Sequence, residues 1–355
     1  MLEDLKVAAI DRAFNRRVEA YNLPALAVAI VQDGDVVYRR AEGCANLEFG
    51  TPATSATMFQ LASVTKLLTA ALLMRLVDEG MLGLEQAVSD HVPDLPPSWR
   101  TITVGQLANH SSGLPSGMVG GGVAPALAGD QVRTAADVVR AASEMPLSGG
   151  PGRISEYGLV DYAVLTEVME RATSQKFPEL LETRVARPLG LTVTFDHAVE
   201  RGMARIADVI PQRASTYFWD GAKQKRMDVI YPRWGYSAGG LFGSLDALVA
   251  FVTRLDKGFL SAGALEAMWR SSGVEGPPPA PFAIGWIPGE FKGVATVGHS
   301  GGPALADLLR APSEKLTVIT LCNQMAAPPQ MARDVLSIVL GESPAAQTAP
   351  DAALR

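Results

Sequence analysis

The sequence predicts an α+β fold in which one antiparallel sheet is built from both ends of the chain around a mostly helical middle part. β-rich runs lie at 25–38 and again at 282–321, whereas the region between residues 82 and 220 has the patterns of helices and loops. Few β-α-β alternations occur, and such alternations are typical of a parallel, doubly wound sheet. We therefore expect residues 1–80 and 221–355 to form one discontinuous sheet domain, and residues 81–220 to form a helical subdomain.

The composition is ordinary for a globular enzyme. The chain has 355 residues, enough for a large core, and its 48% hydrophobic and 19% charged residues argue against disorder. A net charge of −6 without a basic run disfavours nucleic acid and anionic membranes as partners. Two cysteines, Cys44 and Cys322, are too few for a disulfide framework. We see neither a signal peptide nor the run of about 18 to 20 apolar residues that spans a membrane, so we expect a cytoplasmic protein.

Three elements are expected in the first 80 residues. Apolar residues at helical spacing predict a helix over 5–21. Two β-rich runs, 25–31 and 36–38, flank an Asp-Gly pair, which is the strongest short-range signal for a hairpin. A second helix is expected over 63–79, where a glycine ends it. Nearly every position of this helix between residues 67 and 73 is apolar, which indicates that the helix is buried.

The rest of the chain alternates helical and β-like patterns with loops. Glycine and proline are concentrated over 113–126, which predicts an irregular loop at the rim of a site. The Pro/Ala-rich tail, 343–355, is expected to be frayed. Helices are expected at 103–110, 135–143, 161–173, 177–185, 245–255 and 330–340. Strands are expected at 282–286, 294–297, 306–310 and 316–321.

The first turn of the buried helix carries a serine and a lysine. Ser63 and Lys66 are three residues apart and therefore share one helical face. In a purely structural explanation Ser63 caps the helix and Lys66 is solvated. However, the positive end of the helix dipole disfavours lysine, and a desolvated amine would have a lowered pKa and could take the proton of Ser63. The pair is a candidate nucleophile with its own base, although the Ser-x-x-Lys pattern alone is weak.

Two further stretches carry groups that could do chemistry. Tyr157 follows a Pro-Gly turn and precedes an expected helix; taken alone, it is a packed aromatic residue with a hydrogen-bonded hydroxyl. Residues 298–302 contain Gly-x-Ser-x-Gly, the nucleophile-elbow pattern of α/β-hydrolases. Those enzymes place their catalytic histidine after the serine, and none of the four histidines follows Ser300. We therefore reject the elbow.

Together these motifs resemble those of serine β-lactamases and penicillin-binding proteins. Ser63-Val64-Thr65-Lys66, Tyr157 and His299-Ser300-Gly301 occur in the order of that superfamily. The details look most like class C β-lactamases and their relatives, the family VIII carboxylesterases. Supporting stretches lie at 107–114, 187–191 and 238–241, and the resemblance extends from about residue 26 to residue 340. It implies a β-lactamase/transpeptidase-like fold with the site between the sheet and the helical subdomain.

The resemblance also implies a role for individual residues. Ser63 would be the acylated nucleophile and Lys66 its proton acceptor or relay. Tyr157, with a pKa lowered by the nearby lysine charge, would be the partner base that protonates the leaving group. The oxyanion hole would consist of the backbone N–H groups of Ser63 and Gly302. His299, Ser300 and Gly301 would contact the substrate.

Two departures from the lactamase pattern favour an ester over an anionic amide as the substrate. Lactamases have Tyr-x-Asn at the second motif, and the third position of this motif, where their asparagine contacts the substrate amide, is Leu159 here. The third motif begins with His299 where lactamases have lysine, so a fixed positive charge is lost because histidine is largely neutral at pH 7. Tyr-x-Leu resembles the esterase branch, and both changes make the site more apolar and less suited to an anionic amide.

Other candidate residues have simpler explanations. His110 is expected to pack or to cap a turn, and Trp234 and Tyr236 could line the acyl pocket or belong to the core. The histidines and cysteines show no metal-ligand spacing, and Gly120-Gly121-Gly122 lacks the residues of a phosphate loop. We therefore expect neither a metal nor another cofactor.

The sequence thus predicts a serine hydrolase that cleaves carboxylic esters with small to medium acyl groups through an acyl-enzyme. Amide chemistry stays open as the alternative, as in a D-aminopeptidase, a weak β-lactamase or an acyltransferase. A second alternative is a non-catalytic scaffold or peptide-binding protein of the same fold. The sequence specifies neither the physiological substrate nor the oligomeric state.

Overall fold

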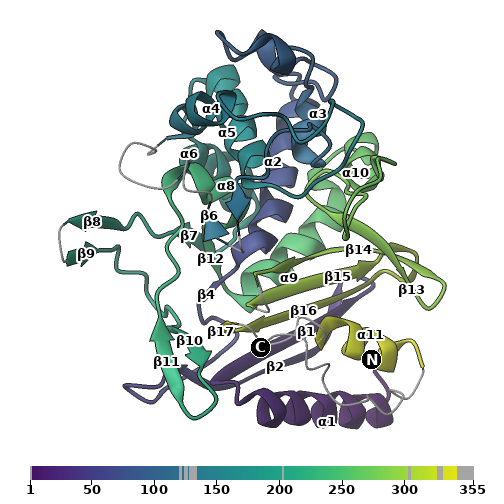
Figure 1. The fold of residues 1–355 in the computed structure, drawn as a ribbon. Coiled ribbons are helices and arrows are strands. Elements are labelled where there is room, and N and C mark those ends of the chain that lie inside the picture. Colours follow the sequence, from purple (N-terminus) through teal and green to yellow (C-terminus); the bar gives the residue numbers. More distant parts are fainter. Residues whose placement is uncertain are drawn as a thin grey trace.

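The computed structural model is built around a seven-stranded antiparallel sheet that joins the two ends of the chain (Figure 1). Its strand order is β13-β14-β15-β16-β1-β2-β3. The strands are β1 (Ala25–Gln32), β2 (Asp35–Asn46), β3 (Thr51–Pro52), β13 (Ile287–Phe291), β14 (Val294–Gly301), β15 (Ala306–Ala311) and β16 (Leu316–Cys322). The structure describes residues 2–119, 122–123, 127, 134–201, 204–302, 305–325 and 331–341.

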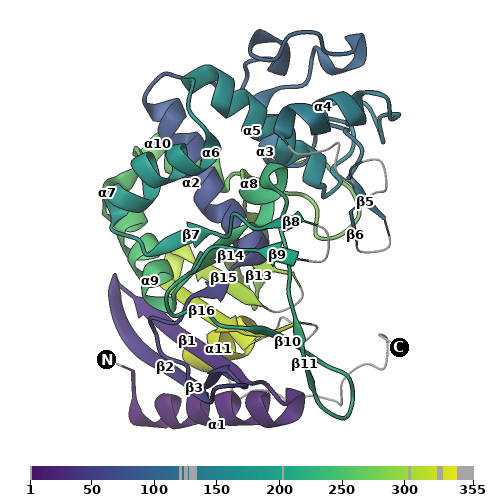
Figure 2. The ribbon, with the colours of Figure 1, turned by 90° about the vertical axis from the view of Figure 1, so that its left-hand side faces the viewer.

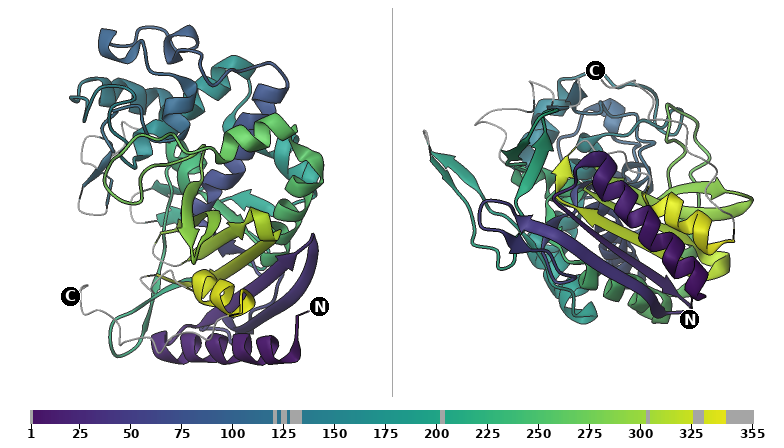
Figure 3. Two further views of the ribbon diagram at one scale, coloured as in Figure 1. Left: turned by 90° about the vertical axis from the view of Figure 1, so that its right-hand side faces the viewer. Right: turned by 90° about the horizontal axis from the view of Figure 1, so that it is seen from below.

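Both faces of the sheet are covered, so its central strands are apolar on both sides. In β1, Leu26, Val28 and Ile30 face one core, while the alternate residues face the other. Helices α1 (Asp4–Tyr21) and α11 (Met331–Val339) lie side by side over the first face (Figure 3, right). On the second face α9 (Leu245–Arg254) packs against β1 and β16. The predicted antiparallel sheet built from the two chain ends is confirmed.

Helix α2 (Thr65–Asp78) lies at the centre of the main core. Its residues from Thr65 to Met74 are all buried, because α8 (Tyr236–Gly239), α10 (Ala262–Trp269) and α6 (Phe177–Leu181) pack around it (Figure 2). An all-round apolar sequence suits a helix enclosed in this way. The α-helix begins at Thr65; Ser63 lies in the 3₁₀ turn η1 (Ala62–Val64) that precedes it.

The middle of the chain adds a mostly helical layer above the sheet (Figure 1). Its helices are α3 (Val104–Ala108), α4 (Ala135–Ser143), α5 (Leu159–Thr173), α6, a π-helical turn Glu182–Ala186 and α7 (Arg187–Leu189). Small sheets connect the layers: β4 (Phe59–Gln60) with β12 (Leu241–Gly243) and β7 (Val193–Phe195), and β10 (Thr216–Trp219) with β11 (Gln224–Met227) and β17 (Gln324–Met325). The hairpins β5 (Met118–Val119)–β6 (Gly122–Val123) and β8 (Val199–Arg201)–β9 (Ala204–Ile206) complete the strands. The domain boundary predicted at residue 220 falls inside the β10–β11 hairpin.

One predicted strand is wrong. Residues 282–286 form a buried connection, and the strand β13 begins only at Ile287. Gly285 has a φ of +72° and lies so close to α2 that a Cβ would approach the Lys66 carbonyl oxygen to 2.6 Å. Its N–H donates to Ala108 O (3.0 Å) instead of to a neighbouring strand. A short apolar run that is buried on all sides resembles a strand in sequence, which explains the error.

Several expectations fall partly or wholly outside the described residues. The tail 343–355 lies outside them, as do residues 120, 121 and 124–126 of the predicted loop 113–126. The described part of that loop contains β5 and β6. Among the residues that the structure describes, no helix is long and apolar enough to cross a membrane.

Candidate active site

The turn that carries Ser63 is held in an unusual conformation between the sheet edge and the helical layer. Ala62 has a φ of +44°, in the left-handed region that alanine rarely adopts. Strand β4 leads into this turn, and Leu61 N–H donates to Leu241 O (2.9 Å). On the other side, Gly301 of β14 approaches so closely that a Cβ would lie 2.2 Å from Leu61 O. Only glycine permits this close approach. Backbone strain such as the positive φ of Ala62 is concentrated at functional sites.

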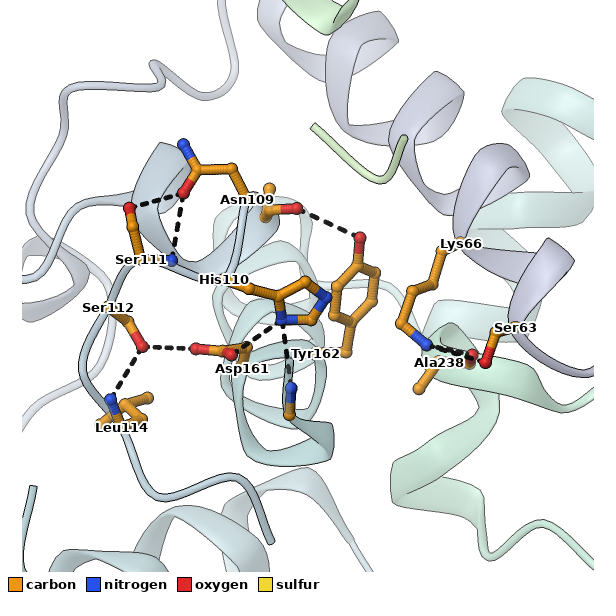
Figure 4. Close-up of polar contacts among 12 residues, drawn as sticks. Ser63, Lys66, Asn109, His110, Ser111, Ser112, Leu114, Asp161, Tyr162 and Ala238 are labelled. Atoms are coloured by element: carbon orange, nitrogen blue, oxygen red, sulfur yellow. Dashed lines mark hydrogen bonds and ion pairs between the residues drawn. The ribbon is translucent and has the colours of Figure 1, made fainter. Parts of the chain in front are cut away.

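The structure brings Ser63, Lys66 and Tyr157 together. Tyr157 Oη donates a hydrogen bond to Ser63 Oγ (2.8 Å), and Lys66 Nζ lies 3.5 Å from the same oxygen. Lys66 Nζ also donates to Ala238 O (2.6 Å), as Figure 4 shows, and lies 4.8 Å from the centroid of the Tyr157 ring. The hydroxyl of Ser63 is therefore within reach of two proton-transferring groups.

The surroundings of the site favour a neutral amine at Lys66. The side chain is fully buried, and this desolvation lowers the pKa of Lys66 to about 7. Asp161 is the one carboxyl group that opposes the shift. Near pH 7 a large share of Lys66 is thus unprotonated and can accept the proton of Ser63, whereas an ordinary lysine cannot.

The pKa shift that we expected for Tyr157 has the wrong direction. Burial raises the pKa of Tyr157, and the nearby Tyr231 raises it further, while the hydrogen bond with Ser63 lowers it only in part. We expected the lysine charge to lower this pKa. That charge is only partial, because a pKa of about 7 leaves about half of Lys66 neutral at pH 7, and desolvation is the largest effect on the pKa of Tyr157. Tyr157 is a protonated phenol that donates to Ser63, which leaves Lys66 as the better base.

The third motif places His299 and Ser300 on opposite faces of β14. The His299 ring is buried 5.9 Å from the Tyr157 ring, and burial followed by the charge of Lys66 lowers the pKa of His299 to about 3. The Ser300 hydroxyl instead donates to Asp307 Oδ1 (2.9 Å) on β15. Since side chains alternate along a strand, Ser300 points to the face covered by α1 and α11. The Ser300 hydroxyl therefore points away from Ser63, and a contact of Ser300 with substrate stays a prediction for its backbone alone.

The remaining predicted substrate residues lie at different depths. Gly302 follows β14, and a Cβ on it would lie 3.8 Å from the Cβ of Ala62, so its backbone is beside the Ser63 turn. Its part in an oxyanion hole stays a prediction. Leu159 is the first residue of α5 and is half-buried against the main core. Trp234 is buried in that core, in a turn that packs on α4 and α5.

Tyr231 borders the site and could not be identified from the sequence. Its ring packs on the backbone of Gly239, where a Cβ would lie 2.3 Å from it, next to the Ala238 carbonyl that binds Lys66. Tyr231 also raises the pKa of Tyr157, so the two phenols are near each other. Tyr231 is only partly buried. It therefore borders the site in the segment where we considered Trp234, and the only sequence signal was its position shortly before the Ala-Gly-Gly stretch at 238–240.

A buried polar cluster behind Tyr157 was also missed. His110 Nδ1 lies 2.9 Å from Asp161 Oδ2, and Ser112 Oγ donates to Asp161 Oδ1 (2.5 Å), as Figure 4 shows. The His110 ring packs against the Tyr157 ring, with the centroids 4.7 Å apart. His110 does pack, as expected, but against a residue of the site. Within the described part of the chain, no group of three His, Cys, Asp or Glu side chains could hold a metal ion.

Comparisons with known proteins agree with this arrangement. Esterase EstB from Burkholderia gladioli is 32% identical over 197 residues, which cover 52% of this chain and 50% of EstB. A D-aminopeptidase from Gluconobacter oxydans is 26% identical over 353 residues, which cover 96% of this chain and 63% of that protein. The chain thus matches only about half to two thirds of the length of these curated relatives.

Solved structures agree as well. The octameric penicillin-binding protein homologue from Pyrococcus abyssi superposes with a TM-score of 0.79 at 26% identity, covering 95% of this chain and 78% of that one. The sequence profile of the family described as Beta-lactamase matches residues 10–341 of this chain. This match spans nearly the whole sheet and the helical layer, including Ser63, Lys66 and Tyr157. The chain therefore belongs to the Beta-lactamase family.

Proposed function

We propose that this protein is a serine hydrolase that cleaves carboxylic esters with small to medium acyl groups through an acyl-enzyme on Ser63. The observation that carries the proposal is the position of the Ser63 hydroxyl. It accepts a hydrogen bond from Tyr157 at 2.8 Å and has, 3.5 Å away, an amine whose pKa is about 7. A nucleophile beside a base that is half neutral at physiological pH is the arrangement that covalent catalysis requires.

The reaction follows from these contacts. Lys66 takes the proton of Ser63 as Oγ attacks the ester carbonyl, and the oxyanion forms beside the backbone N–H groups of Ser63 and Gly302. The C–O bond to the alcohol then breaks while Tyr157 passes its proton to the leaving oxygen. The protonated Lys66, 4.8 Å from the Tyr157 ring, returns a proton to the phenolate. The acyl-enzyme is then hydrolysed by the same steps in reverse, with water in the place of the alcohol, and the carboxylic acid product is released.

Two features support an ester over an amide. Leu159 offers no amide group to a substrate amide, and His299 is neutral at pH 7 because its pKa is lowered to about 3. An ester also needs less help than an amide from the acid that protonates its leaving group. The similarity to esterase EstB supports this preference, whereas the similarity to the D-aminopeptidase keeps amide hydrolysis as the second candidate.

A non-catalytic scaffold is less consistent with Lys66. A fully buried lysine costs stability, because its charged form is desolvated, and a protein without catalytic use for the amine gains nothing from it. The net charge of −6 without a basic run supports a small-molecule substrate instead of nucleic acid. We also propose a cytoplasmic location.

Labelling with a fluorophosphonate probe tests the nucleophile. The wild type and Ser300→Ala should be labelled, and Ser63→Ala should not. Labelling of Ser63→Ala that disappears in Ser300→Ala would restore the rejected elbow. The absence of any labelling would support the scaffold.

Turnover of three substrates then tests the preference: a p-nitrophenyl ester, a D-alanyl amide and a chromogenic cephalosporin. We expect the ester to have the highest kcat/KM. If the cephalosporin were the best substrate, our interpretation of Leu159 and His299 would be wrong.

A further inference from the structure

We propose that His110, oriented by Asp161 and Ser112, is a positioning residue that holds Tyr157 at the Ser63 hydroxyl. This inference rests on the proposed function, because it assigns His110 to the placement of a group in that reaction. His110 lies just after α3, and its φ of +58° is unusual for a residue other than glycine. It is 2% exposed, so its conformation is set by what surrounds it.

Three contacts connect His110 to the segment that carries Tyr157. The N–H of Glu156 donates to the His110 carbonyl oxygen (2.9 Å), and the N–H of Gly158 donates to His110 Nδ1 (3.4 Å). Between them, the Tyr157 ring packs on the imidazole at 4.7 Å between centroids and 49° between planes. One residue therefore holds the residue before Tyr157, the residue after it and the ring itself.

The hydrogen bonds around His110 have one consistent direction. The 2.9 Å contact between His110 Nδ1 and Asp161 Oδ2 is the shorter of the two at this nitrogen, and the raised pKa of Asp161 makes its carboxyl group the donor. The longer contact from the N–H of Gly158 (3.4 Å) shares the single lone pair of Nδ1. Ser112 Oγ donates to the other carboxyl oxygen (2.5 Å) and accepts from Leu114 N–H (3.0 Å). Burial raises the pKa of Asp161 well above its ordinary value and lowers that of His110 well below it. The pair is thus neutral, with its bonds directed at the Tyr157 segment.

The remaining surroundings of the imidazole fix its plane. The His110 ring also lies against the rings of Tyr162 (5.2 Å between centroids) and Phe282 (4.9 Å). Its Nε2 is buried and finds no hydrogen-bond partner among the residues that the structure describes. The Nδ1 side therefore carries the polar function of this ring, and Nε2 does not. This asymmetry provides a test.

Two isosteric replacements separate the two nitrogens. His110→Asn places an amide oxygen near the position of Nδ1 and tolerates a positive φ, whereas His110→Gln places its amide nearer the position of Nε2. Rates of p-nitrophenyl ester hydrolysis should be expressed per site that a fluorophosphonate labels, so that misfolded protein does not count. We expect His110→Gln to lower kcat about 10²-fold with KM within about threefold. His110→Asn should retain at least ten times the kcat of His110→Gln.

Further variants test the cluster and control for its packing. Asp161→Asn keeps a neutral side chain that can donate to His110 Nδ1 and accept from Ser112, so its kcat should stay within about threefold of the wild-type value. Asp161→Ala can do neither, and its kcat should fall about tenfold or more. Ser111→Ala is the matched control: among the described residues its hydroxyl, in the same segment, bonds to Asn109 and not to the cluster, so its kcat should be unchanged.

Equal kcat values for His110→Asn and His110→Gln, or a kcat of His110→Gln near that of the wild type, would overturn the proposal. If neither variant folds, Ser112→Ala decides: an unchanged kcat contradicts the proposal, and a loss of about tenfold supports it. A wild-type protein that is not labelled at Ser63 would instead refute the proposed function itself.

Discussion

The rate of Ser63 acylation should follow the titration of Lys66. With a pKa of about 7, half of the amines are neutral at pH 7, compared with about one in three thousand at the ordinary lysine pKa of 10.5. Burial thus increases the concentration of the base about 10³-fold. Between pH 5 and pH 7 the neutral fraction rises from about 1% to about half. The acylation rate should therefore rise about 50-fold over this interval and level off above pH 8.

The assay is the pre-steady-state burst of p-nitrophenol, measured from pH 5 to pH 9. The two histidines that face Lys66 do not produce a midpoint near 7, because His299 titrates near 3 and the pKa of His110 is also lowered, and burial raises the pKa of Tyr157 above its ordinary value of 10. Burial raises the pKa of Asp161 as well, so Asp161→Asn is a second control and should leave the midpoint unchanged. The matched variant is Lys66→Arg, which retains the charge but cannot deprotonate. Its burst should be at least about 10³-fold slower at pH 7.

Asp307 is the natural control, since its pKa is also raised to about 7 but its carboxyl group accepts from Ser300 on the far face of the sheet. Asp307→Asn should leave the midpoint of acylation unchanged. A rate that is flat from pH 5 to pH 8, or a midpoint that disappears in Asp307→Asn, would refute the assignment of Lys66 as the base.

Three further outcomes are expected. Lys66→Met should abolish turnover but should be more stable than the wild type at pH 7. The gain is up to about 5 kcal/mol, because the variant avoids the desolvation that shifts the lysine pKa from 10.5 to about 7, and losing the hydrogen bond to Ala238 O reduces this gain. The difference in free energy of unfolding between this variant and the wild type, measured with urea, should shrink from pH 7 to pH 10. In this interval the unfolded wild-type chain binds more protons than the folded protein, so the stability of the wild type rises with pH. A difference that grows with pH would contradict this. Tyr157→Phe should lower kcat about 10²- to 10⁴-fold with little change in thermal stability, and activity near that of the wild type would exclude Tyr157 as the acid. Gly301→Ala should lose activity and at least about 2 kcal/mol of stability, because its Cβ would meet Leu61 O at 2.2 Å; an active, stable variant would show that the Ser63 turn can move.

The sequence was sufficient where local geometry decides. Ser63 and Lys66 meet because three residues along a helical path return to the same face, whatever the rest of the fold does. The antiparallel sheet could be predicted from the positions of its strands along the chain. Residues 282–286 were mistaken for a strand because a run buried on all sides lacks the alternation that distinguishes strands from buried connections.

The sequence was insufficient where register or burial decides. Ser300 was assigned to the substrate, but the alternation of β14 turns its hydroxyl to Asp307. The pKa of Tyr157 was inferred from a neighbouring charge alone, whereas desolvation is the larger effect. The His110 cluster depends on contacts among separate segments, and no periodic pattern marks buried polar residues.

The site as a whole is arranged to carry little charge before the reaction begins. Burial drives Lys66, His299 and His110 toward their neutral bases and Asp161 toward its neutral acid, each by the same desolvation. The amine that accepts the serine proton is then the one group that becomes charged, at the same time as the oxyanion forms, so the two charges arise as a pair in a dry environment. A substrate that brings its own carboxylate would add an unpaired charge to this environment, and desolvating it would cost several kcal/mol. The same burial that makes Lys66 a base therefore disfavours substrates with a carboxylate beside Ser63, which is a physical reason, independent of Leu159, to expect a neutral ester to react better than a β-lactam.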